Sequence, residues 1–258
     1  MTAPSTPQEL ADLVRGTDRI DVPLFESGLF ASLRGEIRHD VADGVVSCLA
    51  GTTLAELNAA LARDARCVPY VPVWPETDLS LAALILLGLP HAGEAGHGSW
   101  RDWILGSAMV TAEGTIVRSG SRVVKSVAGY DAHKLLVGSR GALLLPAEVT
   151  LRTFHISSAG FPQGVQSLGD NLRSIGRVRR GDLASLLGVL GEDALRGYEG
   201  MGTVWSSRSV QDWPVFPYAW VMDPFCPALP VESREAMRKA KAVLDPGGKL
   251  APGAFHNL

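Results

Sequence analysis

The stretch from residue 93 to 154 constrains the fold more than any other part of the chain. It combines many glycines with a predicted hairpin and one short helix. Glycine lets a chain take positive φ, or lets a ligand approach the backbone closely. Gly114 lies in the predicted hairpin turn between 108–110 and 115–118, and Gly138 follows a helical pattern as a C-cap. The glycines without such a local explanation are Gly96, Gly98, Gly129 and Gly141.

The composition is typical of a soluble globular protein and argues against several partners. Of 258 residues, 46% are apolar and 20% are charged, and the net charge is −3. Because there is no basic run, nucleic acid is not expected as a partner. Cys48, Cys67 and Cys226 have no metal-ligand spacing, so we expect no metal site and a reducing compartment. No signal peptide is visible and the longest apolar run, 79–90, is too short to span a bilayer, which predicts a cytoplasmic location without a membrane anchor of its own.

Capping signals and periodicity predict a mixture of helices and strands. Thr6 with Glu9, and Thr53 with Glu56, have the spacing of a capping box at a helix start. Residues 67–75 carry three prolines and are predicted as an extended connector. Further helices are predicted at 78–89, 131–137, 182–190 and 232–244, and strands at 19–25, 45–49, 142–154 and 202–206. This order has no βαβ rhythm, so the predicted fold class is α+β.

Common catalytic motifs are missing from the sequence. No GxGxxG follows a strand, and neither a phosphate-binding GxxxxGK[ST] nor a GxSxG motif occurs. His91 and His97 flank a glycine loop and are expected to be solvated loop histidines rather than metal ligands. The polar residues of the central stretch also have structural explanations, and the chemistry alone favours these. Asp102 is expected as a turn acceptor, Lys125 as a surface charge, Tyr130 as a packing residue and Asp131 as the cap of the helix at 131–137.

Three sequence motifs are more informative about function than the periodicity is. They read GSWRDWILG at 98–106, RVVKSVAGYD at 122–131 with LLVGSRG at 135–141, and AVLDPGGKLAPG at 242–253. Together they resemble the smaller flavin-binding subunits of bacterial glycolate oxidases, in the FAD-linked oxidases of the vanillyl-alcohol oxidase and p-cresol methylhydroxylase type. The string at 122–131 is the specific part, and the likeness runs from about residue 6 to the C-terminus.

This resemblance implies an architecture and a site. The FAD domain would have two α+β lobes at 1–75 and 76–155, followed by a reduced cap domain at 156–230 and a C-terminal helix and tail at 231–258 that return to the FAD domain. The flavin would lie between the lobes, held largely by backbone amides, with Lys125 placing positive charge near the reduced flavin or the diphosphate. No catalytic base can be named. The residues expected on the cofactor side are Gly96, Gly98, Ser99, Asp102, Lys125, Gly129, Tyr130, Asp131, Gly138 and Gly141.

Three stretches depart from the pattern of the family. Residues 22–30 have one glycine where a glycine-rich loop would cradle phosphate, 78–83 lack a glycine pair, and 144–147 contain Pro146, which has no N–H. Two hypotheses follow. The chain is either an FAD-binding subunit that takes part in the oxidation of a small 2-hydroxy acid, or a flavin-free paralogue with a structural or assembly role. The resemblance implies a larger flavin subunit and an iron–sulfur subunit as partners, through which the complex would associate with a membrane.

Overall fold

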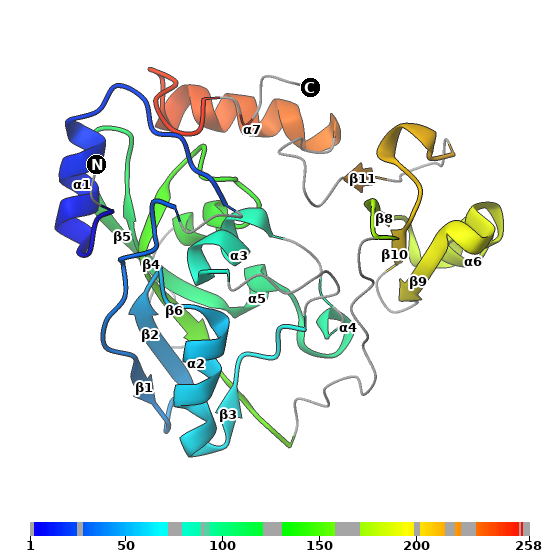
Figure 1. The fold of residues 1–258 in the computed structure, drawn as a ribbon, viewed down its shortest axis with the longest axis horizontal. Helices are drawn as coiled ribbons and strands as arrows, with labels where there is room; N and C mark the ends of the chain where they lie inside the picture. The colour runs from blue at the N-terminus through cyan, green and yellow to red at the C-terminus, as the bar shows by residue number, and fades with distance from the viewer. Residues whose placement is uncertain are drawn as a thin grey trace.

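The computed structural model of the protein describes residues 3–24, 28–71, 79–88, 91, 93–120, 131–157, 171–198, 202–214, 220–222, 231–252 and 254. Helices are mixed with sheets in which every strand pair is antiparallel, so the predicted α+β class is confirmed. Figure 1 shows a larger part built around one sheet and a smaller part that holds a second sheet. Among the described residues, no helix has the length and apolar character needed to cross a membrane.

A five-stranded sheet is the centre of the larger part. Its order is β1-β2-β6-β4-β5, and β6 pairs Leu151 with Val46 of β2 and with Ile104 of β4. The strands are β1 Arg38–Asp40, β2 Val45–Leu49, β4 Ile104–Val110, β5 Ile116–Gly120 and β6 Leu145–Arg152. Strands from residues 1–75 and from residues 76–155 thus share one sheet. A division into two lobes at residue 75 stays a prediction, as do the other domain boundaries.

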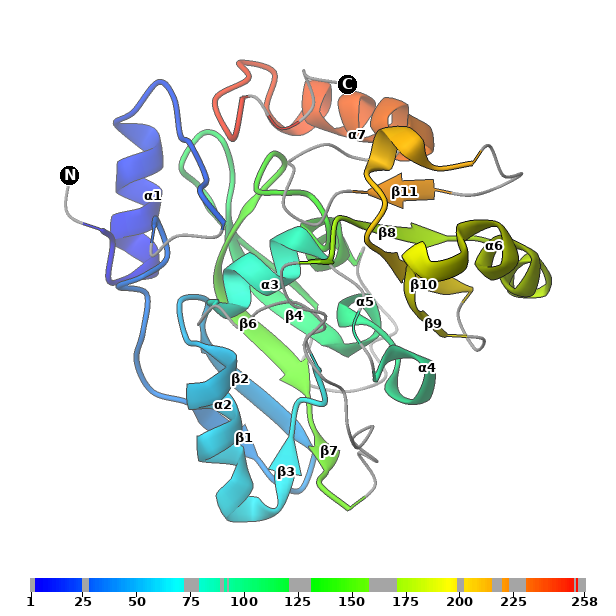
Figure 2. The same cartoon turned by 45° about the vertical axis from the view of Figure 1, so that its right-hand side comes forward.

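Three helices pack on this sheet. They are α1 Pro7–Arg15, α2 Leu54–Leu61 and α3 Leu81–Leu87, and Figures 1 and 2 show α2 and α3 over the same face. Every residue of α3 is buried. Complete burial of one leucine side chain is worth about 1.5–3 kcal/mol, so this helix is a main contributor to the core. The predicted capping of α2 is confirmed, because Thr53 and Glu56 each accept the other's backbone N–H through the side chain.

The start of α1 is also as predicted. The Thr6 hydroxyl accepts a hydrogen bond from the Glu9 amide, and Pro7 occupies the first turn. Short elements complete this part of the molecule. They are β3 Arg66–Cys67, which pairs with β7 Phe154–His155, the helices α4 Glu94–His97 and α5 Trp100–Trp103, and the 3₁₀ turns η1 Ala62–Asp64 and η2 Ala132–Leu136.

The smaller part is a four-stranded sheet with one helix on it. Its order is β11-β8-β10-β9, and α6 packs on it through Leu183, Leu186 and Leu190. Ile175 and Trp205 of this sheet belong instead to the core of the larger part, so the sheet is buried on both faces. The elements are β8 Ser174–Arg177, η4 Arg180–Asp182, α6 Leu183–Leu190, η5 Gly191–Asp193, β9 Ala194–Tyr198, β10 Thr203–Ser206, η6 Val210–Asp212 and β11 Trp220–Met222.

The last helix, α7 at Val231–Leu244, lies across the top of the larger part in Figure 1. The tail after it returns to the N-terminal region, where Ile20 forms a parallel bridge with Leu250. Residues 19–24 contain no other pairing, so the predicted strand at 19–25 is wrong. Pro23 has no N–H for a ladder, and Ile20 takes its hydrogen bonds from the tail at Lys249 and Ala251 instead.

Two further predictions need correction. The strand predicted at 142–154 begins only at Leu145, because residues 139–142 form a turn in which the Ala142 amide donates to the carbonyl of Ser139. The helix predicted at 131–137 is the 3₁₀ turn η2, and Asp131 does not cap it. Its carboxylate pairs with Lys134 at 2.9 Å, and a hydrogen bond from Lys134 lowers the pKa of Asp131.

Candidate cofactor-binding site

The turn at 50–52, directly after β2, is the meeting point of the three stretches that depart from the family pattern. The Ala50 amide donates to the carbonyl of Ala147 at 3.0 Å, and the Ala50 carbonyl accepts from the Ala82 amide at 2.8 Å. The Gly51 amide donates to the carbonyl of Leu33 at 2.9 Å. The turn is hydrogen-bonded directly to the stretches 78–83 and 144–147, and the stretch 22–30 contacts it through the backbone carbonyl of Phe30 beside Gly51.

The start of α3 has its amides already paired. The Leu81 amide donates to the Thr52 carbonyl at 2.9 Å, and the Ala83 amide donates to the hydroxyl of Ser80 at 3.2 Å. The Thr53 amide on the facing turn donates to Glu56 at 2.9 Å. A diphosphate is held by N–H groups that have no partner in the protein. The described donors of this corner do not meet that condition.

The loop at 138–141 contacts the other end of α3. The Gly138 amide donates to the Ile85 carbonyl at 3.0 Å, and the Arg140 amide donates to the Leu86 carbonyl at 2.9 Å, so this loop is bonded to α3. Gly141 has φ +77°, and a Cβ placed on it would lie 2.9–3.1 Å from the side chain of Val22. The two predicted site glycines thus lie at the end of α3 that is farther from the turn at 50–52, and Gly141 faces Val22.

Four other predicted residues lie at the bend between α4 and α5. The Asp102 carboxylate accepts from the Ser99 amide at 2.8 Å and from the Ser99 hydroxyl at 2.9 Å. Gly98 ends α4 with φ +82°, and a Cβ on it would crowd Asp102. Gly96 has no atom within 4 Å of the position its Cβ would take. These contacts agree with a turn-forming role for Asp102, and the assignment of the four residues to a cofactor site stays a prediction.

The remaining predicted site residues cannot be placed. Lys125, Gly129 and Tyr130 lie outside the described residues. Their neighbour in the motif, Asp131, is exposed and paired with Lys134, as described above.

His91 differs from its prediction, because it is 2% exposed rather than solvated. Its Nδ1 accepts from the Gly93 amide, so its Nε2 is assigned the proton and donates to the Gly98 carbonyl at 3.1 Å. The ring packs against Tyr70 and Trp103. Burial lowers the pKa of His91 to about 4, so the residue is neutral at pH 7. Within the described part of the chain, no group of three metal-binding side chains is found.

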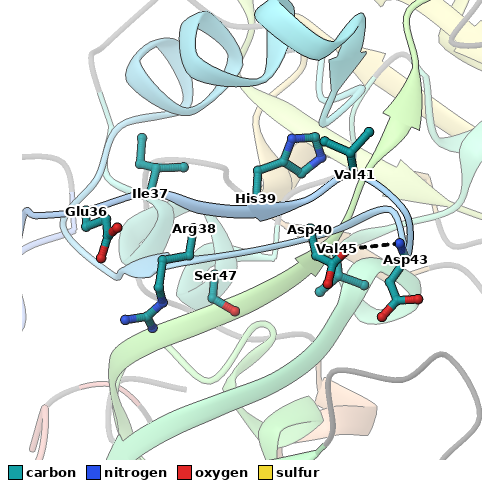
Figure 3. A pocket seen from close by; sticks show the side chains of 9 residues that line it. All are labelled: Glu36, Ile37, Arg38, His39, Asp40, Val41, Asp43, Val45 and Ser47. Atoms are coloured by element: carbon teal, nitrogen blue, oxygen red, sulfur yellow. Dashed lines mark hydrogen bonds between the residues drawn. The ribbon is translucent and has the colours of Figure 1, made fainter.

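A hollow of about 560 Å³ runs beside the edge strand β1, away from all of these residues. Figure 3 shows His39 and Val41 on one side of the strand, with Arg38 and Ser47 on the other. His39 pairs with Asp64 at 2.7 Å, and Asp40 accepts the Asp43 amide. None of the predicted site residues lines this hollow, so it does not belong to the candidate site.

The hydrogen bonds of these stretches show whether their amides could bind the diphosphate of FAD. The amides at 50–53, 81–84, 138–140 and 142 all have acceptors within the chain. Phe30 and Leu33 are buried against the turn at Gly51, where a ligand would need space. These paired amides, with Phe30 and Leu33 buried beside Gly51, do not fit the group. Sequence reasoning identified 22–30, which includes Val22 and Phe30, as an altered loop. It did not identify Leu33, because the partner of Leu33, Gly51, is distant in the sequence.

Comparison with known proteins supports the resemblance. The chain is 32% identical over 119 residues to glycolate oxidase subunit GlcE of Escherichia coli, a match that covers 46% of this chain and 34% of that protein. It is 27% identical over 168 residues to D-lactate dehydrogenase of Archaeoglobus fulgidus, covering 58% of this chain and 38% of that protein. The match thus spans about a third of the length of these curated relatives.

No family model matches the sequence. Among solved structures, alkyldihydroxyacetonephosphate synthase is similar with a TM-score of 0.49 and 14% identity, over 73% of this chain and 36% of that one. The sequence relationship is the stronger finding of the two. The resemblance is confirmed by it: the chain is a sequence relative of the FAD-linked oxidases, among them glycolate oxidase subunits and D-lactate dehydrogenases.

Proposed function

We propose that the protein is a subunit of an FAD-linked oxidase that acts on a small 2-hydroxy acid. The observation that carries the proposal is the 32% identity to glycolate oxidase subunit GlcE over 119 residues. A second relative is a D-lactate dehydrogenase, and glycolate and D-lactate are both small 2-hydroxy acids. In such enzymes the flavin accepts the electrons, and the protein supplies binding and orientation.

The proposal includes partners, since the relative GlcE is itself called a subunit. The partners would be a larger flavin subunit and an iron–sulfur subunit, as the resemblance implies. A cytoplasmic location, with membrane association through these partners, belongs to the same proposal. No catalytic role is assigned to a residue of this chain.

Two versions of the function differ in where the flavin is held. In the first, this chain binds FAD itself, with Lys125, Gly129 and Tyr130 among the contacts. The sequence relationship supports this version. In the second, the chain is a structural or assembly subunit without flavin. A specific observation favours the second version, namely the paired amides around Gly51.

A genetic experiment tests the proposal in either version. The gene is deleted in its host, and reduction of a dye acceptor by cell extracts is measured with glycolate or D-lactate as substrate. We expect the rate with at least one substrate to be lost and to return when the wild-type gene is restored. The Val243→Ala variant should restore the rate as well as the wild-type gene does, because Val243 is 79% exposed and its loss should leave the fold intact. Unchanged rates with both substrates after deletion would contradict the proposal.

A further inference from the structure

Two short stretches of the N-terminal region, 20–24 and 28–33, lie against the corner where the candidate site would be. Phe30 is 4% exposed and Leu33 is fully buried, both within the main core. Leu24 belongs to the same core, and Val22 packs against it. These stretches are therefore an integral part of the folded protein.

The first closure is at Gly51. A Cβ on this glycine would clash with the backbone carbonyls of Phe30 and Leu33, so the two stretches of main chain are in direct contact. The Gly51 amide is hydrogen-bonded to Leu33, and the Leu33 amide is in turn bonded to Phe30. Between the turn at Gly51 and the segment that covers it, no space remains for a phosphate group.

The second closure is at Gly141, in the loop that is bonded to the other end of α3. This glycine has positive φ and no side chain, which are the properties that let a ligand approach a backbone. The side chain of Val22 occupies the position of approach, with three atoms 2.9–3.1 Å from an added Cβ. The open side of Gly141 is thus filled by the chain itself.

The segments that take part in both closures are joined to α3 by hydrogen bonds. Ala50 joins Ala147 to Ala82, and the loop at 138–140 joins α3 through Ile85 and Leu86. A diphosphate could enter only by replacing several of these bonds at once and by exposing buried apolar side chains. Each of those changes opposes binding.

We propose that the stretches 20–24 and 28–33 fill, in this chain, the place of the flavin diphosphate. The protein is then complete and stable without flavin, and the flavin of the oxidase is bound by another subunit. This inference rests on the proposed function for the identity of the complex. It goes further by naming the residues that replace the cofactor, which are Val22, Phe30 and Leu33.

The full-length chain tests this inference directly. It is purified, its absorbance spectrum is recorded, and its melting temperature is measured with and without an excess of FAD. We expect a colourless protein and an unchanged melting temperature. A tightly bound ligand at a hundred times its Kd would raise the melting temperature by roughly 5–10 °C for a protein of this size. Co-purified flavin, or a rise of that order, would overturn the inference.

A matched pair of variants distinguishes a site that the chain fills permanently from a working site at which the stretch 28–33 competes with FAD. Leu33→Ala and Leu186→Ala both remove a fully buried leucine, one at the corner and one under α6. We expect both variants to melt several degrees lower and neither to be restored by FAD. If FAD raised the melting temperature of Leu33→Ala alone, the stretch would only compete with flavin at a working site, and the inference would fail.

Amide exchange provides a readout that needs no variant. The amides of Gly51, Leu81 and Ala82 have acceptors within the chain, so we expect slow exchange without FAD and no change on its addition. Rapid exchange that slows with FAD would contradict the inference. The proposed function stands or falls separately, because it depends on loss of 2-hydroxy-acid oxidation after gene deletion and not on which subunit carries the flavin.

Discussion

Gly138 and Gly141 differ in one respect that can be measured at the scale of single residues. Both have positive φ, at +76° and +77°, but only Gly141 has a neighbour in the position of a Cβ. Alanine at either site should cost about 1–2 kcal/mol for the left-handed conformation. Gly141→Ala should cost about 1–3 kcal/mol more, because its methyl group overlaps Val22. Urea unfolding of the two variants measures the difference.

The double variant Gly141→Ala with Val22→Ala tests the cause of that difference. Removing the two methyl groups of Val22 should bring the double variant closer to Gly138→Ala, after subtraction of the Val22→Ala effect. Equal losses for Gly138→Ala and Gly141→Ala would show that Val22 does not crowd Gly141.

Lys241 is a second residue whose substitution has a specific expected effect. It belongs to α7, and its buried side chain reaches the tail at Leu250. Its ammonium donates to Asp245 at 2.8 Å and to the carbonyls of Ala142 and Leu250. Lys241→Met should lower the free energy of unfolding by about 3–5 kcal/mol, since it leaves a buried carboxylate unpaired. Lys239→Met is the control, because its pair with Glu235 is exposed and should contribute under about 1 kcal/mol.

The pH dependence of the Lys241→Met effect follows from Asp245. Burial opposes ionisation of this carboxyl, but hydrogen bonds from Lys241 and from the Leu250 and Lys249 amides outweigh it and lower its pKa. The stabilisation is therefore present above the ordinary aspartate pKa and is lost as the pH falls through the lowered value. Urea unfolding from pH 7 downward should show the advantage of the wild type shrinking in acid. An advantage that stays constant with pH would contradict this assignment.

At the scale of elements, the pair Glu94–Arg177 joins α4 to β8 and so joins the two parts of the molecule. Arg177 reaches both carboxylate oxygens, at 3.0 and 3.2 Å, and the Glu94 side chain is 8% exposed. Arg177→Met should cost about 3–5 kcal/mol at pH 7, because the carboxylate would remain buried without its partner. Arg208→Met, which breaks a more exposed pair with Asp193, should cost much less than Arg177→Met.

The pKa of Glu94 is shifted in the opposite direction to that of Asp245. Burial raises the pKa of Glu94, and the attraction of Arg177 only partly compensates. Stability from this group is complete below the ordinary glutamate pKa and is lost as the pH rises through the raised value. The cost of Arg177→Met, measured by urea unfolding, should therefore decrease in acid as Glu94 takes up a proton. A cost that grew in acid would rule this account out.

Local signals explain which elements could be predicted. The start of α2 was predictable because Thr53 and Glu56 lie three residues apart and satisfy each other. The strand at 19–25 failed because its partner, Leu250, is more than two hundred residues away and leaves only one bridge. The strand at 142–154 was too long by one turn, since a run of apolar residues does not distinguish a buried turn from a buried strand.

At the scale of the whole molecule, the sequence identified the altered loops of the candidate site, but it did not predict the contacts between them. The altered loops at 22–30 and 78–83 were visible as missing glycines. The stretch 78–83 is hydrogen-bonded to Ala50 and Thr52, and Phe30 contacts Gly51 through its backbone carbonyl. These contacts join segments that are distant in the sequence and share no pattern. The resemblance identified the altered stretch 22–30, and the structure adds that Phe30 and Leu33 are both buried beside Gly51.

The N-terminal region and the tail are joined by backbone hydrogen bonds, and the last prediction concerns this contact. Ile20 exchanges backbone hydrogen bonds with Lys249 and Ala251, and Leu250 between them is fully buried. Leu250→Ala should lower the free energy of unfolding by about 2–5 kcal/mol through the cavity it leaves. Val243→Ala, at a 79% exposed position, should change it by under about 0.5 kcal/mol.

Amide exchange at Ile20 shows whether Leu250 acts on this contact itself. The Ile20 amide is bonded to Lys249, so loosening the tail should speed its exchange more than that of Ala50, whose partner lies in β6. Equal acceleration at both amides would mean that Leu250 stabilises the core in general and does not fasten the tail. Selective acceleration at Ile20 would show that the tail holds the segment leading to Val22, and so would connect the C-terminus of the described chain to the closed corner of the candidate site.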